Sequence, residues 1–186
     1  MTASEKGFTV WFTGLSGAGK STISRLVAEE LERRGLLVER LDGDAVRRHL
    51  SSELGFSKEH RDLNVERIGW VASRLVRAGA VVIVAAISPY REARRRARAL
   101  VEEQGAFVEV HVATSLEDCM SRDTKGLYAR ALAGEVPNFT GVSDPYEEPE
   151  APEVRIDTAA RPPEASVALV LDRLAQLGLL PVGIEQ

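Results

Sequence analysis

The sequence predicts an α/β fold in which a parallel five-stranded sheet carries helices on both faces. Three observations predict it. Apolar runs typical of strands alternate with segments of helical periodicity along most of the chain. The run AVVIVAAI at 80–87 is apolar throughout, as expected for a strand that is buried on both sides. The glycine-rich stretch GLSGAGKST, residues 14–22, lies between an apolar strand at 8–13 and a helix that Gly35 ends.

The stretch 14–22 fits the phosphate-binding loop pattern G-x-x-x-x-G-K-[ST], and the strand before it and the helix after it indicate a fold of the P-loop NTPase type. Its glycines let the backbone turn tightly and bring N–H groups close to phosphate oxygens. The N-terminus of the following helix adds partial positive charge. Lys20 supplies a cation for the outer phosphates, and the hydroxyl of Ser21 is placed for Mg²⁺.

The remaining elements are predicted from apolar runs and helical spacing. Further strands are expected at 37–41, 80–87, 107–112 and 154–156. Further helices are expected at 45–50, at 58–78, after Ser88, after Ser115 and at 163–177. Asp44 is the expected N-cap of the first of these, and Ser88 of the third, with Pro89 at its first helical position. Ser115 and Asp118 resemble a capping box that opens a helix carrying Cys119.

The composition is that of one globular domain. The chain has 186 residues, of which 44% are hydrophobic and 28% charged, and its net charge is −4. We expect a single domain spanning 1–186, with short tails at 1–6 and 178–186. The negative net charge argues against nucleic-acid binding, so a site for anions has to concentrate Arg and Lys locally. The arginine-rich segment 91–98 is therefore interpreted mainly as a solvated helix face, with Arg91 nearest to the site.

The single cysteine, Cys119, excludes an intrachain disulfide and fits a reducing compartment, where it would pack as a small apolar residue. No run of residues is long and apolar enough to span a membrane. The polar start MTASEKG does not resemble a signal peptide. A cytoplasmic protein without membrane contact is therefore expected.

The segment 124–153 departs from the strand–helix alternation. It is polar and rich in glycine and proline, and it contains three isolated aromatic residues, Tyr128, Phe139 and Tyr146. A segment of this kind is typical of an active-site lid. A disordered linker is the alternative, but a linker does not usually contain three isolated aromatic residues.

Ligands of open parallel sheets bind at the carboxyl ends of the strands. There the phosphate loop, Asp42, Asp44 and Ser88 should meet. Small-molecule kinases, GTP switches and ATPases that drive a partner all use a phosphate loop. The chain has no N-K-x-D guanine motif, and the strand at 80–87 ends in Ser88 rather than in the Asp-Glu pair of motor ATPases. A kinase needs an acceptor pocket and a lid, and the chain has candidates for both.

Eight blocks occur in a fixed order over about residues 8–158: GLSGAGKST, LDGD, LGFS, HRDLNVERIG, ISPYR, RDTKGLY, GEVPNFTG and DPYEEPEAPEVRIDT. In this order they resemble adenylylsulfate (APS) kinases, and ISPYR, KGLY with NFTG, and PYEEPE are far more specific than the phosphate loop. The resemblance implies transfer of the γ-phosphoryl group of ATP to the 3′-hydroxyl of adenosine 5′-phosphosulfate, which gives ADP and 3′-phosphoadenosine 5′-phosphosulfate (PAPS) in sulfate assimilation. It also implies Mg²⁺ as cofactor and a homodimer.

The same resemblance implies roles for individual residues. The ATP-binding positions are Gly14, Leu15, Ser16, Gly17, Ala18, Gly19, Lys20, Ser21, Thr22 and, beside the adenine of ATP, Arg122. Ser21 is the metal-binding position. The catalytic positions are Lys20, Asp44, Ser88 and Lys125. The acceptor-binding positions are Arg47, Phe56, Arg61, Asn64, Ile87, Ser88, Lys125 and Phe139.

Within this set, Asp44 would orient or deprotonate the 3′-hydroxyl, and Asp42 is expected to be structural. Arg47 and Arg61 would grip the phosphosulfate, because paired guanidinium donors suit a dianion. Two aromatic rings, Phe56 and Phe139, would sandwich the substrate adenine, and stacking explains an aromatic residue in a polar loop better than core packing does.

Ser88 occupies the position that this family describes as a phosphoserine intermediate. The sequence gives Ser88 another role, because a Ser before a Pro at a helix start is an ordinary N-cap. No histidine or other base lies near it in sequence to activate it as a nucleophile. We therefore favour direct in-line transfer, with Ser88 as a structural or substrate-contacting residue.

The chain departs from the family pattern at Ala45, where Asn is usual, and at Leu63, where an acidic residue is common. Two alternatives stay open: another P-loop kinase of a small hydroxyl substrate, of the nucleoside, gluconate or shikimate type, and a non-catalytic nucleotide-binding regulator. The predicted aromatic pair argues against a sugar acid, which offers no ring to stack on. The intact Lys20 and Asp44 argue against a regulator.

Overall fold

Five parallel strands form one sheet in the computed structural model, which describes residues 7–123 and 125–180. The spatial order is β2 (Val38–Asp42), β3 (Val81–Ala85), β1 (Phe8–Thr13), β4 (Ala106–Val112) and β5 (Val154–Ile156). The predicted α/β fold with a five-stranded parallel sheet is confirmed. The predicted tail at 1–6, the end of the tail at 178–186 and the first lid residue, 124, lie outside the described residues.

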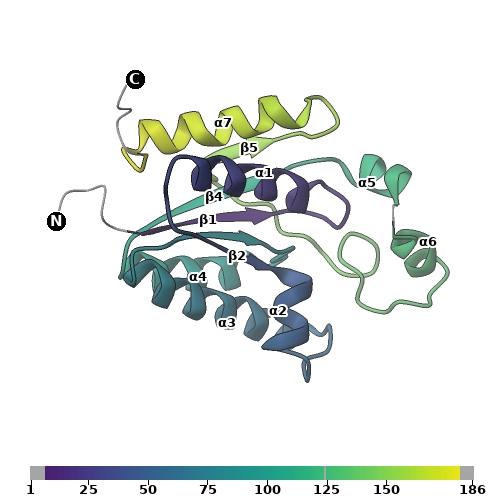
Figure 1. The fold of residues 1–186 in the computed structure, drawn as a ribbon. Helices are drawn as coiled ribbons and strands as arrows, with labels where there is room; N and C mark the ends of the chain where they lie inside the picture. Colours follow the sequence, from purple (N-terminus) through teal and green to yellow (C-terminus); the bar gives the residue numbers. More distant parts are fainter. Residues whose placement is uncertain (1–6, 124, 181–186) are drawn as a thin grey trace.

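Helices cover both faces of the sheet (Figure 1). One face carries α1 (Lys20–Arg33) and α7 (Pro163–Gln176), and the other carries α3 (Lys58–Arg77) and α4 (Arg91–Glu102). All side chains of the central strand β1 are buried. Phe8, Val10 and Phe12 of β1 pack in the core beneath α1 and α7, whereas Trp11 packs in the core beneath α3 and α4. Because both faces of β1 are buried, its sequence FTVWFT is apolar apart from two threonines.

Three shorter helices lie beyond the carboxyl ends of the strands: α2 (Gly43–His49), α5 (Leu116–Arg122) and α6 (Leu127–Leu132). Helix α6 lies within the predicted lid segment. The last part of that segment runs along α4, where Arg95 bonds to Glu150 and Arg98 bonds to Glu153. The arginine-rich face of α4 therefore binds an acidic stretch of the same chain.

Two predicted helix starts are wrong. The N-cap of α2 is Asp42, not Asp44, because the Asp42 carboxylate accepts hydrogen bonds from the backbone N–H groups of Asp44 and Ala45. Helix α4 begins at Arg91, with Tyr90 as its N-cap, so Ser88 does not cap it. Ser88 has a φ of 46°, a left-handed conformation that differs from the extended backbone of an N-cap.

The other predicted elements agree with the structure to within a few residues. Ser115 caps α5 by accepting a hydrogen bond from the backbone N–H of Asp118, and Cys119 on that helix is fully buried. None of the helices within the ranges 7–123 and 125–180 combines the length and the apolar character needed to cross a membrane.

Candidate active site

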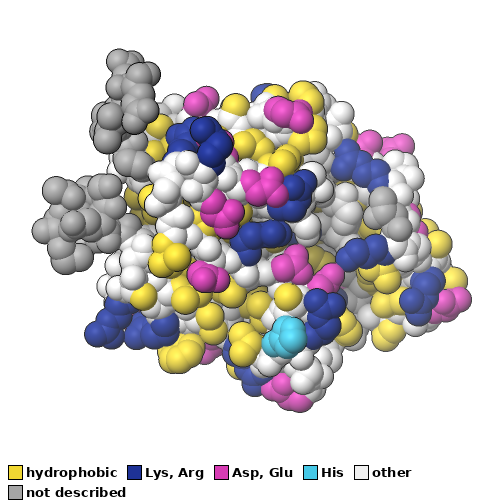
Figure 2. Space-filling view, in the orientation of Figure 1, with side chains coloured by type: hydrophobic (Ala, Val, Ile, Leu, Met, Phe, Trp, Pro, Cys, Tyr) yellow, Lys and Arg dark blue, Asp and Glu magenta, His cyan; other side chains and the backbone are white. Residues whose placement is uncertain are grey.

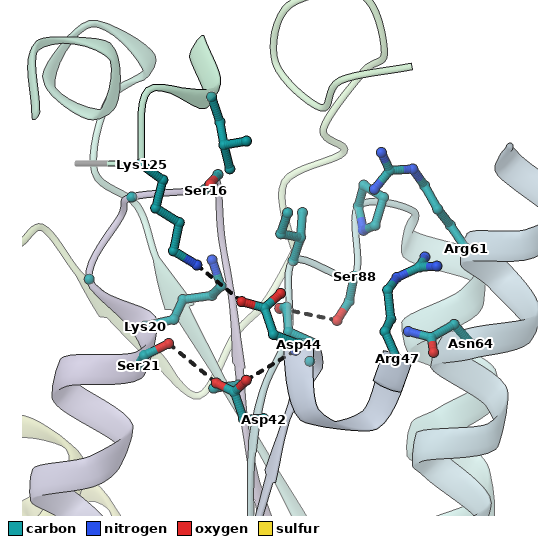
Figure 3. Close-up of a pocket in the computed structure, with 18 of the residues that line it drawn as sticks. Ser16, Lys20, Ser21, Asp42, Asp44, Arg47, Arg61, Asn64, Ser88 and Lys125 are labelled. Atoms are coloured by element: carbon teal, nitrogen blue, oxygen red, sulfur yellow. Dashed lines mark hydrogen bonds and ion pairs between the residues drawn. The ribbon is translucent and has the colours of Figure 1, made fainter. Parts of the chain in front are cut away.

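A cavity of about 490 Å³ lies at the carboxyl ends of the strands, between the phosphate loop, α2, α3 and the predicted lid segment (Figure 3). It gathers most of the predicted site residues: Ser16, Gly17, Gly19, Lys20, Ser21, Thr22, Asp44, Arg47, Phe56, Arg61, Asn64, Ile87, Ser88, Arg122 and Lys125. Four predicted residues are missing from the described lining: Gly14, Leu15, Ala18 and Phe139. The face shown in Figure 2 carries Lys and Arg side chains interspersed with Asp and Glu rather than one continuous field of positive charge.

The phosphate loop has the backbone that its glycines allow. Gly17 and Gly19 have φ values of 74° and 102°, in the left-handed region that other residues avoid. Gly19 is the N-cap of α1 and has no side chain with which to satisfy the first N–H groups of the helix. An anion at the N-terminus of this 14-residue helix would receive those hydrogen bonds.

Lys20 lies under the loop and is nearly fully buried. Its ammonium donates hydrogen bonds to the carbonyls of Gly14 and Leu15, at 2.9 and 2.7 Å. Burial lowers the pKa of Lys20 to about 8, from a usual value near 10.5. A buried cation whose hydrogen bonds among the described residues go to neutral carbonyls attracts phosphate charge strongly.

Ser21 and Asp42 meet at the base of the cavity, with 3.4 Å between Ser21 Oγ and Asp42 Oδ2. The same carboxylate caps α2, so its position is fixed by the backbone. A serine hydroxyl and a carboxylate are oxygen ligands of the kind that Mg²⁺ takes together with nucleotide phosphates and water. The two side chains therefore fit the metal position predicted at Ser21.

Asp44 projects into the cavity from the first turn of α2, because Asp42 occupies the capping position (Figure 3). Its Oδ2 lies 3.0 Å from the ammonium of Lys125 in the lid. Both side chains are largely exposed, so each remains accessible to a ligand. The catalytic acid and the lid lysine predicted from the sequence are thus direct neighbours.

Arg47, Phe56, Arg61 and Asn64 form one side of the cavity, called here the acceptor compartment. The guanidinium carbons of Arg47 and Arg61 lie 4.4 and 5.4 Å from the centre of the Phe56 ring. Burial lowers the pKa of both arginines, and the charge of Arg61 lowers that of Arg47 further. Two adjacent cations that are partly withdrawn from water attract an anion with two or more acceptor oxygens.

Asn64 adds a polar group to this compartment. The residue is only 6% exposed, and its Oδ1 has no hydrogen-bond partner among the described residues. A buried carbonyl oxygen without a donor costs roughly 1–3 kcal/mol, which a ligand N–H or O–H can recover. The side chain is therefore ready to accept a hydrogen bond from a bound molecule.

Ser88 and Ile87 also line the cavity, and Ser88 lies on the side of Arg47 and Arg61 (Figure 3). The Ser88 hydroxyl accepts a hydrogen bond from the indole N–H of Trp11 at 3.0 Å and donates one to the carbonyl of Ala86 at 3.3 Å. Ser88 is 3% exposed. Its hydroxyl is therefore already engaged as both donor and acceptor, which suits a structural residue better than a nucleophile.

Arg122, on α5, is linked to the phosphate loop through Thr158. It donates to the hydroxyl of Thr158, which in turn donates to the carbonyl of Ala18 at 2.7 Å. Sequence reasoning missed Thr158. The residue follows β5, and its position after a strand end in the block VRIDT is the signal that could have found it.

Phe139 is placed differently from the prediction. It is 9% exposed and packs edge-to-face on Tyr128, with 5.0 Å between the ring centres. The Tyr128 hydroxyl donates to the carbonyl of Ser16 in the phosphate loop. Phe139 is therefore part of the core in this structure, contrary to the expectation that core packing would not explain its place. The polar composition of the surrounding lid sequence gave no hint of this contact.

Arg91 does not reach the cavity, contrary to the sequence prediction. Its side chain bonds to the carbonyl of Glu148 and lies 3.7 Å from the carboxylate of Glu150. The arginine that reaches the wall of the cavity is Arg94, which donates to the carbonyl of Ser88 at 2.6 Å. Helical periodicity could have identified it, because Arg94 shares the buried face of α4 with Ala93 and Ala97.

Comparisons with known proteins agree with this geometry. The family model described as adenylylsulphate kinase matches residues 6–157. An adenylyl-sulfate kinase of Picosynechococcus sp. is 53% identical over 175 residues, which are 94% of this chain and 97% of that protein. A probable bifunctional SAT/APS kinase 2 of Sorangium cellulosum is also 53% identical, but the chain spans only 30% of its length.

The structure of the APS kinase CysC of Mycobacterium tuberculosis in complex with AMPPNP and APS superposes with a TM-score of 0.88 at 43% identity, over 91% of this chain and 98% of that one. The matched residues include the phosphate loop, the acceptor compartment and the whole predicted lid segment, 124–153. The chain therefore belongs to the adenylylsulphate kinase family.

Proposed function

We propose that the cavity transfers the γ-phosphoryl group of ATP to the 3′-hydroxyl of adenosine 5′-phosphosulfate, which gives ADP and PAPS as a step of sulfate assimilation. One observation carries this proposal. The cavity has a phosphate loop on one side and a pair of arginines with an aromatic ring on the other, and Asp44 and Lys125 lie between them. Family membership and the related kinase that binds AMPPNP and APS support the same substrates.

The reaction breaks the bond between the γ-phosphorus and the β–γ bridging oxygen and forms a bond from that phosphorus to the ribose 3′-oxygen. Asp44 orients the 3′-hydroxyl and accepts its proton. The ammonium of Lys20 breaks its hydrogen bonds to the two loop carbonyls and binds the β- and γ-phosphates. Lys125, in the lid segment, binds the phosphoryl group while it is transferred. The protein mainly positions the two nucleotides and stabilises the developing charge.

Mg²⁺ is the proposed cofactor, held by the Ser21 hydroxyl, with the Asp42 carboxylate beside it. When bound, it would neutralise negative charge on the phosphates of ATP. The adenine of ATP is proposed to lie near Arg122, on the side of the phosphate loop that Thr158 supports. Gly14, Leu15 and Ala18 complete the loop whose backbone N–H groups are proposed to bind the phosphates, although they are not among the described residues that line the cavity.

The acceptor binds with its phosphosulfate on Arg47 and Arg61 and its adenine on the ring of Phe56. Asn64 accepts a hydrogen bond from this nucleotide. Phe139 reaches the second face of the adenine only after it leaves Tyr128, so this part of the proposal requires the lid segment to move. Ser88 and Ile87 form the wall of the compartment, and transfer is direct.

We further propose that residues 1–186 act as one kinase domain, that the protein forms a homodimer and that it works in the cytoplasm. The buried Cys119, whose thiol pKa is raised by burial, is inert and fits a reducing compartment. Leu63 and Trp70 are exposed apolar side chains on α3 and offer a surface for a second copy. Sedimentation of the purified protein tests the dimer, and a monomer would contradict it.

A coupled ADP-release assay tests the proposed function. Adenosine 5′-phosphosulfate is offered beside AMP, adenosine and gluconate, each with ATP and Mg²⁺. The proposal expects kcat/KM for the phosphosulfate to exceed that for each other acceptor by at least about 100-fold, the scale of a paired-arginine contact. Preference for gluconate or adenosine would favour another small-molecule kinase, and no turnover with any acceptor would favour a regulator.

A further inference from the structure

Arg94 is a buried cation that joins three separate parts of the chain. It projects from α4, it is 3% exposed, and its guanidinium donates in three directions. One bond goes to the Glu109 carboxylate on β4 at 2.9 Å. The other two go to backbone carbonyls, at 2.6 Å to Ser88 and at 2.7 Å to Glu147. The bond to Glu109 is enough to neutralise the charge of Arg94. The two bonds to backbone carbonyls therefore require a separate explanation.

The carbonyl of Ser88 belongs to a strained segment. Ser88 has a φ of 46°, and a non-glycine residue keeps such a backbone only where its surroundings hold it. Trp11 holds the Ser88 side chain, and the Thr13 hydroxyl donates to the carbonyl of Ile87 at 2.6 Å. Arg94 holds the next carbonyl, so the wall of the acceptor compartment formed by Ile87 and Ser88 is fixed from the side away from the cavity.

The carbonyl of Glu147 belongs to the end of the lid segment. The backbone N–H of the same residue donates to the carbonyl of Pro89 at 2.8 Å. Next to it, the Tyr146 hydroxyl lies 2.9 Å from the Thr13 hydroxyl, and the Tyr90 hydroxyl donates to Asp144. The end of the lid segment and the loop after β3 are therefore bound side by side, with Arg94 bonded to both.

We propose that Arg94 is a positioning residue for the acceptor. It holds the backbone at Ile87 and Ser88 in the conformation that shapes the acceptor compartment, and it ties that wall to the end of the lid segment. This inference rests on the proposed function, because it assigns the wall to the sulfated acceptor rather than to ATP. Arg94 acts through the backbone and does not line the cavity among the described residues.

The geometry requires an arginine. A guanidinium offers five N–H donors in a rigid plane, so one side chain can hold two carbonyls and a carboxylate at fixed angles. A lysine at this position keeps the charge beside Glu109, but its compact ammonium lacks the reach and the planar fork for both carbonyls. The substitution Arg94→Lys therefore separates neutralisation of Glu109 from positioning of the wall.

The chain contains a reporter for this wall, since the Trp11 indole bonds to Ser88. Trp11 and Trp70 are the two tryptophans of the sequence, and Trp70 is exposed. Every protein compared carries Trp70→Phe, so the fluorescence emission comes from Trp11. This emission reports the environment of the Ser88 segment independently of enzyme activity. Arg94→Lys is compared with Glu109→Gln, which leaves both carbonyl bonds of Arg94 available.

For Arg94→Lys we expect the KM of adenosine 5′-phosphosulfate to rise about tenfold or more, with the KM of ATP changed less than about twofold, because a small displacement of a positioning group is costly. The Trp11 emission should shift in Arg94→Lys and stay unchanged in Glu109→Gln, whose acceptor KM also stays near that of the parent. A lower melting temperature with unchanged acceptor KM and unchanged emission would make Arg94 merely structural and overturn the proposal. An equal KM effect of Glu109→Gln would also overturn it, because charge burial would then be the cause.

If Arg94→Lys does not fold, the double variant Arg94→Met with Glu109→Leu takes its place in the same comparison. This double variant removes both buried charges together. Failure of the proposed function is distinguishable from failure of the Arg94 proposal. The proposed function fails if the parent protein does not phosphorylate adenosine 5′-phosphosulfate. The Trp11 emission of the variants still decides whether Arg94 holds the Ser88 segment.

Discussion

Lys125 in the lid lies 3.0 Å from Asp44 on α2, although the two residues are 81 positions apart in the sequence. The Asp44 and Lys125 side chains are 74% and 65% exposed, so the ion pair is screened by water and adds little to stability. Its significance is positional, because it brings a carboxylate and an ammonium to the point where the ATP side of the cavity meets the acceptor compartment. In the proposed reaction the two groups separate, Asp44 to the 3′-hydroxyl and Lys125 to the transferred phosphoryl group.

Replacement of Asp44 by Ala should therefore lower kcat by about 100- to 10,000-fold, the usual scale for loss of a general base. Binding of ATP, measured by calorimetry, should change little, because Asp44 does not hold the phosphate loop. Asp172→Ala, on the exposed side of α7, is the control for removal of a surface carboxylate. Turnover of Asp44→Ala at the level of this control would remove Asp44 from the mechanism.

Replacement of Phe56 by Ala tests the stacking surface. The residue is 52% exposed, so the melting temperature should hardly change. The acceptor KM should rise by about 5- to 100-fold, because stacking of a base on an aromatic ring contributes roughly 1–3 kcal/mol. The KM of ATP is measured in parallel, and an equal rise in both KM values would contradict the assignment.

Replacement of Phe139 by Ala should lower both the stability of the protein and its affinity for the acceptor. Because Phe139 is buried against Tyr128, its truncation should also destabilise the protein, by about 3 kcal/mol or more. The acceptor KM should again rise more than the KM of ATP. Tyr128→Phe, which keeps the ring contact and removes the hydrogen bond to Ser16, is the matched control for loop support. A stable Phe139→Ala variant would mean that the contact with Tyr128 contributes nothing.

Replacement of Ser88 by Ala should leave substantial turnover, because the hydroxyl is already bonded to Trp11 and Ala86. Stability should fall by about 1–3 kcal/mol, since the buried Trp11 N–H loses its acceptor. Turnover and thermal unfolding are measured on the same preparation. Complete loss of turnover in a folded variant, with phosphoserine found at this position in the parent protein, would establish the covalent route instead.

ATP binding should depend on pH through Lys20. The pKa of its ammonium is lowered to about 8 by burial, and bound phosphates favour the charged form and raise that pKa again. Affinity for ATP should therefore fall as the pH rises above about 8. Calorimetry with Mg²⁺ present, in buffers of different ionisation enthalpy, should detect proton uptake on binding at about pH 8.5 and much less at about pH 7, where Lys20 is already charged. Equal uptake at both values would contradict this assignment.

The fold could be predicted from the sequence because β3 is a continuous apolar run, β1 is apolar apart from two threonines, and the phosphate loop requires a helix directly after it. The start of α2 was harder to predict, because the carboxylates of Asp42 and Asp44 can both cap a helix and only the backbone geometry decides between them. The prediction that Ser88 caps α4 was wrong for a similar reason. The dipeptide Ser-Pro predicts a cap, but the bonds from Trp11 and Arg94 hold Ser88 in a left-handed conformation that local sequence does not encode.

The cavity was predictable to the extent that its residues lie at strand ends or occur in family blocks. The networks behind it were not, because they join distant segments. Arg94 contacts residues 15 and 53 positions away, through Glu109 and Glu147, and periodicity cannot identify such partners. The packing of Phe139 on Tyr128 depends on the path of the lid, which carries no regular pattern.

The central claim is that a phosphoryl group passes from ATP to the ribose of a sulfated nucleotide. Its most direct test uses ATP labelled in the γ-phosphate, adenosine 5′-phosphosulfate as acceptor and a 3′-specific nucleotidase to locate the label. We expect the label to appear in the sulfated nucleotide and the nucleotidase to release it completely. Label that resists the nucleotidase, or that appears only as inorganic phosphate, would contradict the claim.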